Sequence, residues 1–411
     1  MGATNLKCRE CGTEYGLEAK YVCERCFGPL EVAYAHDVTN VDSVRRRIQG
    51  GPQNLWRYHD FLPLEGPQPR TRTGLPAGCT PLIRADRLAE RLGLGEVWVK
   101  NDAANPTHSF KDRVVSVAVH RAKELGYEVL ACASTGNLAN SVAAHGAALG
   151  MESYVFIPSN LEEQKVLATG VYGTNLVKVR GNYDDVNRLC TELSGERDWA
   201  FVNVNLRPYY AEGSKTLAYE IVEQLGWEVP DRVVAPIASG SLYTKIGKGF
   251  QEWLDLGLVA GAAPVMNGAQ ALGCSPVATA FAAGTDVCRP VKPDTIAKSL
   301  AIGNPADGPY AIELARESGG GIDSVTDDEI RGGIRLLAET TGIFTETAGG
   351  TTTAVLKKLA DRGDIGPDER VAVVITGEGL KTLDAVRGTF TEHEIAPSYD
   401  EFVEQVEGVR A

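Results

Sequence analysis

Long apolar runs are missing from this sequence. No run approaches the length of a membrane-spanning helix, and the first eight residues lack the apolar core of a signal peptide. Positive charge is also scarce, because 41 lysines and arginines face 54 acidic residues and the formal net charge is −13. Such a balance argues against a general nucleic-acid binder and against binding to an anionic membrane. We therefore expect a cytoplasmic protein with neither nucleic acid nor membrane as partner.

Internal repeats and low-complexity segments are absent as well. The apolar content of 43% and charged content of 23% are those of a globular protein, and 411 residues are too many for one hydrophobic core. From residue 96 onward, short apolar segments alternate with helical patterns. Strands are predicted at 96–100, 128–133, 153–158, 175–179, 200–204, 232–237, 342–345 and 370–376. This alternation indicates an α/β protein with two parallel or mostly parallel sheet domains covered by helices.

We divide the chain into four segments. A zinc-ribbon-like segment covers residues 1–32, and a connector with the N-terminal part of the large domain covers 33–95. The small domain is expected at 96–205 and the large domain at 206–411. Within the connector, residues 54–58 hold two aromatic residues and an arginine, and we expect them to dock on the main body. No helix or strand is predicted in the proline- and glycine-broken stretch 264–308.

The nine cysteines fall into two groups. One group has the spacing CxxC, eleven residues, CxxC, and consists of Cys8, Cys11, Cys23 and Cys26. Four thiolates so placed can hold Zn²⁺ tetrahedrally, and a segment this small needs such a staple. We predict structural zinc, with two disulfides or an empty site as alternatives. The other five are scattered, as in reducing compartments: Cys79, Cys132, Cys190, Cys274 and Cys288.

The segment Asn-Pro-Thr-His-Ser-Phe-Lys-Asp-Arg at residues 105–113 follows a predicted strand and precedes a helical pattern. Ser109 and Asp112 have the spacing of a capping box, so the helix is expected to begin just before Lys111. Unpaired amides and the helix dipole disfavour a charged lysine there, whereas a lysine that works as a neutral amine would benefit. In isolation, a solvated surface lysine is the commoner explanation.

Three further motifs follow predicted strands, where ligands bind in open α/β sheets. Ser134, Thr135, Gly136 and Asn137 open a predicted helix and suit a carboxylate or phosphate, with ordinary N-capping as the alternative. Thr376, at the end of the last predicted strand, has a hydroxyl suited to a ring nitrogen, although it is equally typical of a turn.

The third motif lacks the GxxxxGK(S/T) spacing of a nucleotide P-loop and the GxGxxG spacing of a dinucleotide site. Its backbone amides form a nest that suits an isolated phosphate, with a plain strand-to-helix turn as the alternative. It consists of Ala238, Ser239, Gly240, Ser241 and Leu242.

In this order, these motifs resemble the pyridoxal-phosphate enzymes of fold type II, the tryptophan-synthase-β type, and most closely the threonine synthases. The resemblance spans roughly residues 56–385 and includes residues 55–58, 78–82, 212–216, 302–305 and 376–380. Some members of the family also carry an N-terminal cysteine ribbon.

The resemblance implies a role for each motif. Lys111 would form the Schiff base with pyridoxal 5'-phosphate and shuttle protons, and Asn137 would bind the phenolic oxygen of the cofactor. The nest at 238–242 would hold the cofactor phosphate, and Thr376 would face the pyridine nitrogen. The substrate carboxylate would be held by Ser134, Thr135 and Gly136.

The implied enzyme is a carbon–oxygen lyase of threonine biosynthesis. It would convert O-phospho-L-homoserine, a phosphorylated amino acid, and water to L-threonine and phosphate. The smaller domain would close over the site during the reaction. By family likeness, the enzyme would be a homodimer. A β-elimination or β-replacement enzyme acting on serine, phosphoserine or threonine is the alternative within this fold. A ribbon-type binding protein on an inactive enzyme body is an alternative of another class.

The sequence departs from the family at three positions. His108 stands where glycine is common, and Leu138 stands where many threonine synthases place a threonine that helps to hold the substrate phosphate. Tyr210 aligns with an arginine that contacts the same phosphate. We expect Arg207 or Lys215 to take over that contact.

Overall fold

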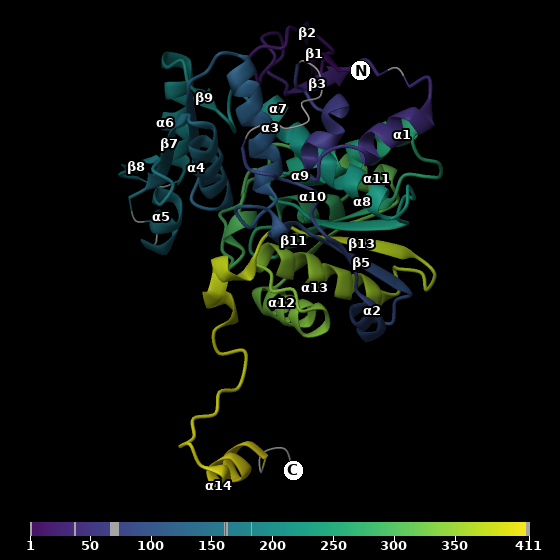
Figure 1. The fold of residues 1–411 in the computed structure, drawn as a ribbon, viewed down its shortest axis with the longest axis vertical. Coiled ribbons are helices and arrows are strands. Elements are labelled where there is room, and N and C mark those ends of the chain that lie inside the picture. The colour runs from purple at the N-terminus through teal and green to yellow at the C-terminus, as the bar shows by residue number, and fades with distance from the viewer. Residues whose placement is uncertain are drawn as a thin grey trace.

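The computed structural model describes residues 2–36, 38–65, 74–159, 161, 163–181 and 183–407. Two sheets, each flanked by helices, lie side by side, and a small antiparallel sheet lies above them (Figure 1). The strand pairing confirms the predicted α/β class with two mostly parallel sheets.

The larger sheet has the strand order β12-β11-β10-β13-β5-β4. All its pairs are parallel except the pair that joins β4 to β5. Its strands are β4 (Leu82–Arg84), β5 (Glu96–Asn101), β10 (Arg232–Pro236), β11 (Val265–Ala271), β12 (Ile322–Val325) and β13 (Arg370–Ile375). One face is covered by α8 (Thr216–Gln224), α9 (Ser241–Asp255), α10 (Pro276–Ala282) and α11 (Gly308–Glu317). The other face is covered by α2 (Asp86–Leu92), α12 (Asp327–Thr341) and α13 (Thr347–Arg362).

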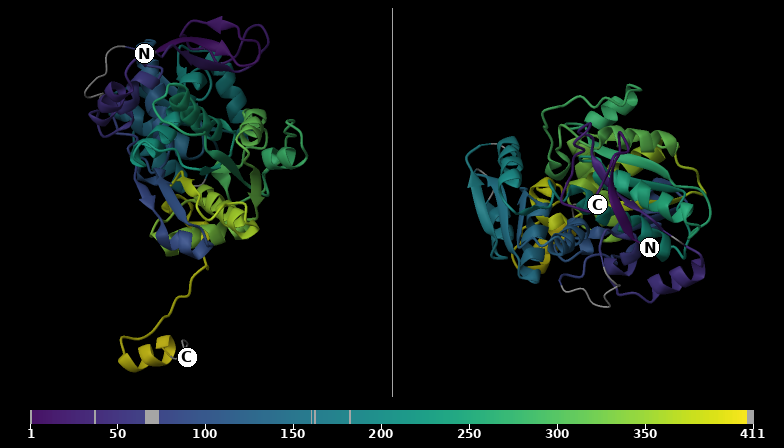
Figure 2. Two further views of the ribbon diagram at one scale, coloured as in Figure 1. Left: turned by 90° about the vertical axis from the view of Figure 1, so that its right-hand side faces the viewer. Right: turned by 90° about the horizontal axis from the view of Figure 1, so that it is seen from above.

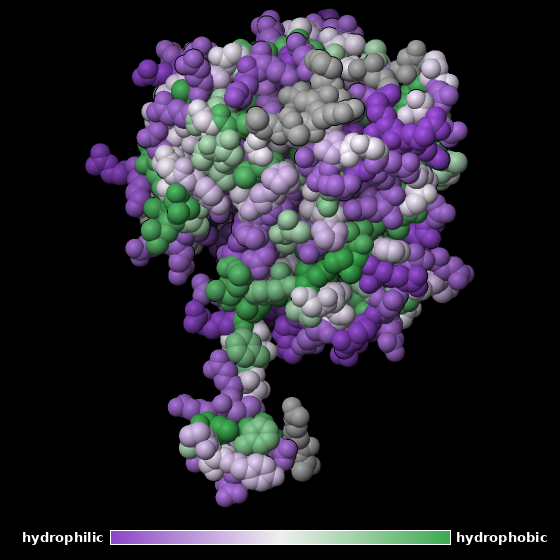
Figure 3. Space-filling model, in the orientation of Figure 1, coloured by the Kyte–Doolittle hydropathy of each residue, from purple (hydrophilic) through white to green (hydrophobic). Residues whose placement is uncertain are grey.

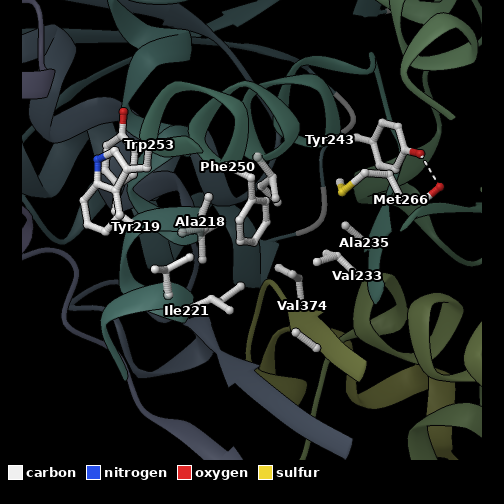
Figure 4. Close-up of a cluster of buried hydrophobic side chains, with 14 of the residues drawn as sticks. Ala218, Tyr219, Ile221, Val233, Ala235, Tyr243, Phe250, Trp253, Met266 and Val374 are labelled. Carbon is white, nitrogen blue, oxygen red and sulfur yellow. Dashed lines mark hydrogen bonds between the residues drawn. The ribbon is translucent and has the colours of Figure 1, made fainter. Parts of the chain in front are cut away.

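Each face of the larger sheet has its own hydrophobic core, because successive side chains of a strand point to opposite faces. Val233 and Ala235 face α9, whereas Val234 packs with α12 and α13. In the first core, the rings of Tyr219 and Trp253 stack with centroids 4.6 Å apart (Figure 4). A parallel sheet that is covered on both faces requires strands with apolar side chains on both faces.

The smaller sheet has the order β8-β7-β6-β9, and all its pairs are parallel. Its strands are β6 (Val129–Ala133), β7 (Glu152–Pro158), β8 (Asn175–Val179) and β9 (Ala200–Phe201). One face packs against α3 (Lys111–Glu124) and α4 (Asn137–Leu149), and the other against α6 (Tyr183–Glu196). The short helix α5 (Glu163–Gly170) packs beside α4 (Figure 1).

The N-terminal sheet consists of β1 (Ala3–Cys8), β2 (Glu14–Tyr15) and β3 (Leu30–Tyr34). Buried polar contacts fix it to the main body. The Tyr34 hydroxyl donates to Glu212 at 2.7 Å, and Glu31 lies 3.1 Å from Lys245. Two lysines of α9 hold the pKa of Glu31 at about 2 although burial acts in the opposite direction. Next come α1 (Val41–Gln49) and the 3₁₀ segment η1 (Leu55–Phe61), whose Trp56 is buried as expected for a docked segment.

Three expectations from the sequence need correction. Strand β5 pairs with β13, so residues 96–101 belong to the larger sheet and not to the small domain. No strand forms at 342–345, because Gly342 (φ 73°) ends α12 in the left-handed conformation. The stretch 264–308 contains β11 and α10. Within the segment 33–95, α1 and η1 precede the first strand of the larger sheet, and residues 37 and 66–73 lie outside the described residues.

The chain ends in an arm that leaves the body. After η5 (Gly379–Val386), residues 388–398 extend away to the short helices α14 (Tyr399–Phe402) and η6 (Val403–Glu407) (Figures 1 and 2). The other short segments are η2 (Asp102–Ala104), α7 (Arg207–Glu212), η3 (Gly213–Lys215) and η4 (Lys298–Leu300). Within the described ranges, no helix has the length and apolar character needed to cross a membrane.

Candidate active site

The site lies where strands of the larger sheet end beside the smaller sheet. The loop before α3 is joined to the loop after β13 by backbone hydrogen bonds: Phe110 N–H donates to the Thr376 carbonyl (2.9 Å), and Glu378 N–H donates to that of His108 (3.1 Å). These bonds bring two motifs that are 265 positions apart in sequence, Lys111 and Thr376, to the same edge.

Helix α3 begins at Lys111, as predicted, but the predicted capping box does not form. The Asp112 carboxylate instead accepts bonds from the Thr107 amide (2.6 Å) and hydroxyl (2.8 Å), and from Ser141 (2.7 Å). Burial acts to raise the pKa of Asp112, but hydrogen bonds from His145, Ser141 and Thr107 outweigh it and lower the pKa. Asp112 therefore fixes the loop that precedes the lysine.

His108 explains one departure from the family pattern. Its φ is +61°, in the left-handed region, and its side chain is exposed. Glycine adopts this conformation without a steric penalty, whereas histidine tolerates it at a cost. The left-handed backbone at this position therefore explains why glycine is common there in the family. No catalytic role of His108 is needed to explain its place in the sequence.

The Lys111 ammonium nitrogen has a neutral partner. Its Nζ donates to the Tyr210 hydroxyl at 2.8 Å and lies 4.7 Å from the centre of the Phe110 ring. Among the described residues, none of the ion pairs includes Lys111. A lysine without a carboxylate partner and half-buried at a strand edge is not the solvated surface lysine of the simpler interpretation.

Asn137 lies between two charged residues that the sequence did not indicate. Its amide Nδ2 donates to Glu346 at 3.0 Å, and its Oδ1 accepts from Lys381 Nζ at 2.8 Å. Burial raises the pKa of Glu346, against the effect of Asn137, Lys381 and Lys111, and burial lowers the pKa of Lys381. Both residues lie more than 200 positions from Asn137 in the sequence, and neither belongs to a recognisable local motif.

Ser134 contacts the start of α4, whose N-cap residue is Gly136 and which has no side-chain cap at that position. Its Oγ accepts from the amides of Gly136 (3.3 Å) and Ala139 (3.2 Å). These contacts leave its hydroxyl hydrogen available, and Thr135 and Gly136 are half-buried beside it. Leu138 is buried in the hydrophobic core beneath α4.

The loop at 238–242 has the form of an anion nest. Gly240 has φ +103°, and a Cβ there would lie 2.6 Å from the Asp307 carbonyl oxygen, so only glycine fits. The amides of Ser241 and Leu242 open the 15-residue helix α9 and have no acceptor within it. The Asp307 amide donates to the Ser239 carbonyl (2.8 Å) and fixes the loop.

The structure separates the two cations that were expected at the substrate phosphate. Arg207 lies near this loop, with Nη2 2.7 Å from Asp307, and its side chain is 29% exposed. Lys215 does not reach the site. Its side chain is fully buried, with Nζ 2.8 Å from Glu212 and 2.9 Å from Glu252. The prediction that Lys215 contacts substrate is wrong, because this lysine neutralises buried carboxylates.

The four N-terminal cysteines converge, as their spacing predicted. All four sulfur atoms lie within 4.8 Å of one another, with Cys8–Cys26 and Cys11–Cys26 separations of 3.4 Å. None of the nine cysteines is in a disulfide. The arrangement has the donor set of a structural zinc site.

Known proteins carry the same pattern. Residues 74–377 match the family described as pyridoxal-phosphate dependent enzymes. Curated threonine synthases of Methanocaldococcus jannaschii and Methanosarcina acetivorans are 40% and 39% identical to the chain, over 386 and 385 residues. These alignments cover 92% and 93% of this chain and 93% of each relative. The processed form of threonine deaminase isoform 2 from Solanum lycopersicum superposes with a TM-score of 0.64 at 20% identity, covering 87% of this chain and 90% of that one.

The chain therefore belongs to the family of pyridoxal-phosphate dependent enzymes, and its fold is fold type II of that class. Within the family it groups with the threonine synthases, which confirms the resemblance drawn from its motifs.

The residues at this edge fit the cofactor. The nest with Gly240 suits its phosphate, Lys111 has a hydroxyl as its hydrogen-bond partner, and Thr376, 2% exposed, offers a neutral hydroxyl to a ring nitrogen. Ser109 Oγ is buried without a hydrogen-bond partner among the described residues, as expected beside a ligand pocket.

Proposed function

We propose that the chain is a threonine synthase that converts O-phospho-L-homoserine and water to L-threonine and phosphate. The observation that carries the proposal is the hydroxyl partner of Lys111, 2.8 Å away, at an edge shared with the phosphate nest. A lysine that alternates between covalent attachment and proton transfer must be able to lose its proton, and a hydroxyl partner permits this where a carboxylate would oppose it.

Four parts of the chain would hold the cofactor: Lys111 through its Nζ, the amides at 238–242 at the phosphate, Asn137 at the phenolic oxygen and Thr376 at the pyridine nitrogen. When bound, the cofactor supplies the electron sink that makes protons on substrate carbons acidic. Glu346 and Lys381 orient the two ends of the Asn137 amide. A neutral hydroxyl at Thr376 keeps this sink milder than a carboxylate would.

The remaining steps belong to side chains of this chain. Ser134, Thr135 and Gly136 hold the substrate carboxylate at the start of α4. The Lys111 amine removes the proton from Cα and then from Cβ, and returns one to Cγ after phosphate has left. Arg207 is a partly exposed cation beside the nest, and we assign it to the substrate phosphate. On binding, this phosphate would replace Asp307 as the partner of Arg207. Closure of the smaller sheet over the larger one keeps water out until it is needed at Cβ.

The test has two parts. The active protein should release phosphate from O-phospho-L-homoserine in step with threonine formation. In a separate sample, borohydride reduction should fix the bound cofactor on Lys111, where peptide mass analysis locates it. Serine, phosphoserine and threonine serve as competing substrates, because Leu138 and Tyr210 depart from the family residues that contact the substrate phosphate. A protein that carries the cofactor on Lys111 but releases oxo acid from these amino acids, and no phosphate from O-phospho-L-homoserine, is the alternative β-elimination enzyme.

We also infer that Cys8, Cys11, Cys23 and Cys26 bind one structural Zn²⁺. A tetrahedron with metal–sulfur distances of about 2.3 Å has edges of about 3.8 Å. Three of the six sulfur separations are 3.4–3.6 Å, and all six are within 4.8 Å. Elemental analysis should find one zinc per chain, and none in a Cys11→Ser, Cys26→Ser variant.

We further infer a homodimer in the cytoplasm. Apolar side chains gather where the C-terminal arm leaves the body (Figure 3), among them Leu380, Leu383 and Phe390, which are 54–67% exposed. A hollow of about 650 Å³ between α12 and residues 386–391 lies beside them. On the arm, Tyr399 and Phe402 are exposed at helical spacing, so the arm of a second copy is a suitable occupant.

Light scattering should give twice the chain mass for the full chain, and a lower mass or a concentration-dependent one for a chain that ends at residue 387. An equal mass for both would remove the arm from the interface. Cell fractionation tests the location, which the unpaired cysteines support.

A further inference from the structure

We propose that Tyr210 is a second catalytic residue, which passes protons from Lys111 to the phosphate that leaves the substrate. The inference rests on the proposed function, because it concerns the elimination of phosphate. It gives a role to the tyrosine that stands in place of an arginine in the family pattern.

The hydroxyl of Tyr210 is placed for proton transfer. Its Oη is 2.8 Å from Lys111 Nζ, and the residue is 9% exposed. A phenol has one hydrogen to donate and two lone pairs to accept with. The lysine uses one lone pair, and no acceptor for the phenolic hydrogen occurs among the described residues. That hydrogen is therefore free to meet a ligand in the site.

The helix that carries Tyr210 is anchored on both sides of it. The neighbouring Tyr209 donates its hydroxyl to the Glu18 carbonyl of the N-terminal ribbon at 2.8 Å. Glu212, two residues on, is fully buried among Lys215, Lys245 and Lys248. Anchors of this kind hold a catalytic hydroxyl at a fixed position without contributing to the chemistry themselves.

Arg207 indicates which ligand atom Tyr210 meets. The two residues are three positions apart on α7, so their side chains lie on the same face of the helix. If Arg207 holds the substrate phosphate, the phenolic hydrogen of Tyr210 lies between that phosphate and Lys111. A carboxylate at this position would hold the lysine in its charged form, and a second cation would repel it, whereas a neutral hydroxyl does neither.

The protons balance as follows. Lys111 first holds the proton from Cα as an ammonium group. It passes a proton to Tyr210 while Tyr210 passes its phenolic proton to a phosphate oxygen of the substrate, so the lysine is again a free amine and the tyrosine is again neutral. The amine then takes the proton from Cβ, the electron pair of that C–H bond stays on the substrate, and the electron pair of the breaking Cγ–O bond leaves with the phosphate. The proton from Cβ is the one that Lys111 returns to Cγ.

The test compares Tyr210→Phe with Tyr209→Phe, which removes a hydroxyl of the same helix that points to the ribbon. We measure the kcat and KM of phosphate release from O-phospho-L-homoserine. We also measure deuterium exchange at Cα of L-2-aminobutyrate in D₂O, a reaction that needs Lys111 but has no leaving group. The Tyr210 variant should lose about 10²- to 10³-fold in kcat, with KM little changed and exchange reduced by less than about 10-fold. The Tyr209 variant loses one anchor of the helix but no group of the relay, so any loss of phosphate release should be matched by an equal loss of exchange.

Three outcomes overturn the proposal. One is phosphate release by the Tyr210 variant at nearly the native rate. Another is an equal loss of exchange and release, which would make Tyr210 a positioning residue for Lys111. A third is exchange without phosphate release by the unaltered chain, which refutes the proposed function and this inference with it. If the variant fails to fold, the proton inventory of the unaltered enzyme decides: two protons in flight give a curved plot, and a straight plot excludes the relay.

Discussion

Arg113 provides the sharpest test of how the fold supports the site. Four charged side chains form a neutral cluster beneath the lysine loop, each at most 1% exposed: Lys100, Asp102, Arg113 and Glu220. Arg113 is bonded to both carboxylates, with Nε 2.7 Å from Asp102 and Nη1 2.6 Å from Glu220. The substitution Arg113→Met keeps most of the volume and leaves a buried net charge of −1.

The expected loss is large because it leaves a buried charge without compensation. Breaking a buried ion pair by removing one partner costs about 3–5 kcal/mol, whereas the pair itself contributes much less. We therefore expect the free energy of unfolding of the cofactor-free chain to fall by ~3–5 kcal/mol. The double variant Arg113→Met, Glu220→Gln removes the excess charge and should be no less stable than the single variant.

The assay is urea unfolding followed by tryptophan fluorescence and circular dichroism, whose transitions must coincide. Arg331→Met is the control, because Arg331 pairs with Asp328 at an exposed i,i+3 position and should lose less than about 0.5 kcal/mol. A loss below about 1 kcal/mol for Arg113→Met would show that this cluster does not hold the lysine loop in place.

Three other predictions concern Glu346, His108 and Glu220. Glu346→Ala leaves the Asn137 amide and Lys381 without their anionic partner. An absorbance titration should therefore show cofactor binding weakened about 10-fold or more. Unchanged binding would contradict the proposal that Glu346 orients the Asn137 amide. His108→Gly relieves a left-handed residue and should raise the free energy of unfolding by up to about 1 kcal/mol without reducing activity; a loss of activity would assign the histidine a role in the site. Arg113 and Lys100 hold the pKa of Glu220 at about 2, although burial acts to raise it. The contribution of ionised Glu220 to stability is therefore complete above the ordinary pKa of about 4.5 and is lost as pH falls toward 2. Unfolding measured from pH 6 to pH 3 should show this decline in the native chain and a weaker one in Glu220→Gln; parallel curves would exclude it.

Much of the fold could be predicted from periodicity, because most strands of both sheets are apolar on two faces. Strand β11 could not. It contains Asn267, Gly268 and Gln270, which read locally as a loop. In the fold, Arg232 donates to Asn267 at 2.8 Å and the amide of Val277 donates to Gln270 at 3.0 Å, so distant partners satisfy the polar groups. A Cβ at Gly268 would lie 2.3 Å from the side chain of Ile237, so close packing requires glycine there.

The site shows the same division. Lys111, Asn137, Gly240 and Thr376 lie in motifs that are contiguous in sequence, and the sequence was sufficient to propose them as site residues. Glu346 and Lys381 act through contacts with Asn137 that arise only when the two sheets meet. The role expected for Lys215 was wrong for a related reason, since no local pattern reveals that Glu212 and Glu252 bury its ammonium group.

The proposed reaction is tested most directly by oxygen tracing. The loaded enzyme is incubated with O-phospho-L-homoserine in water enriched in ¹⁸O, and both products are analysed by mass. Cleavage of the Cγ–O bond followed by water addition at Cβ predicts one ¹⁸O in each threonine, none in the released phosphate, and equal amounts of the two products. Phosphate that carries ¹⁸O, or phosphate release without threonine, would contradict the assignment of this chain as a threonine synthase.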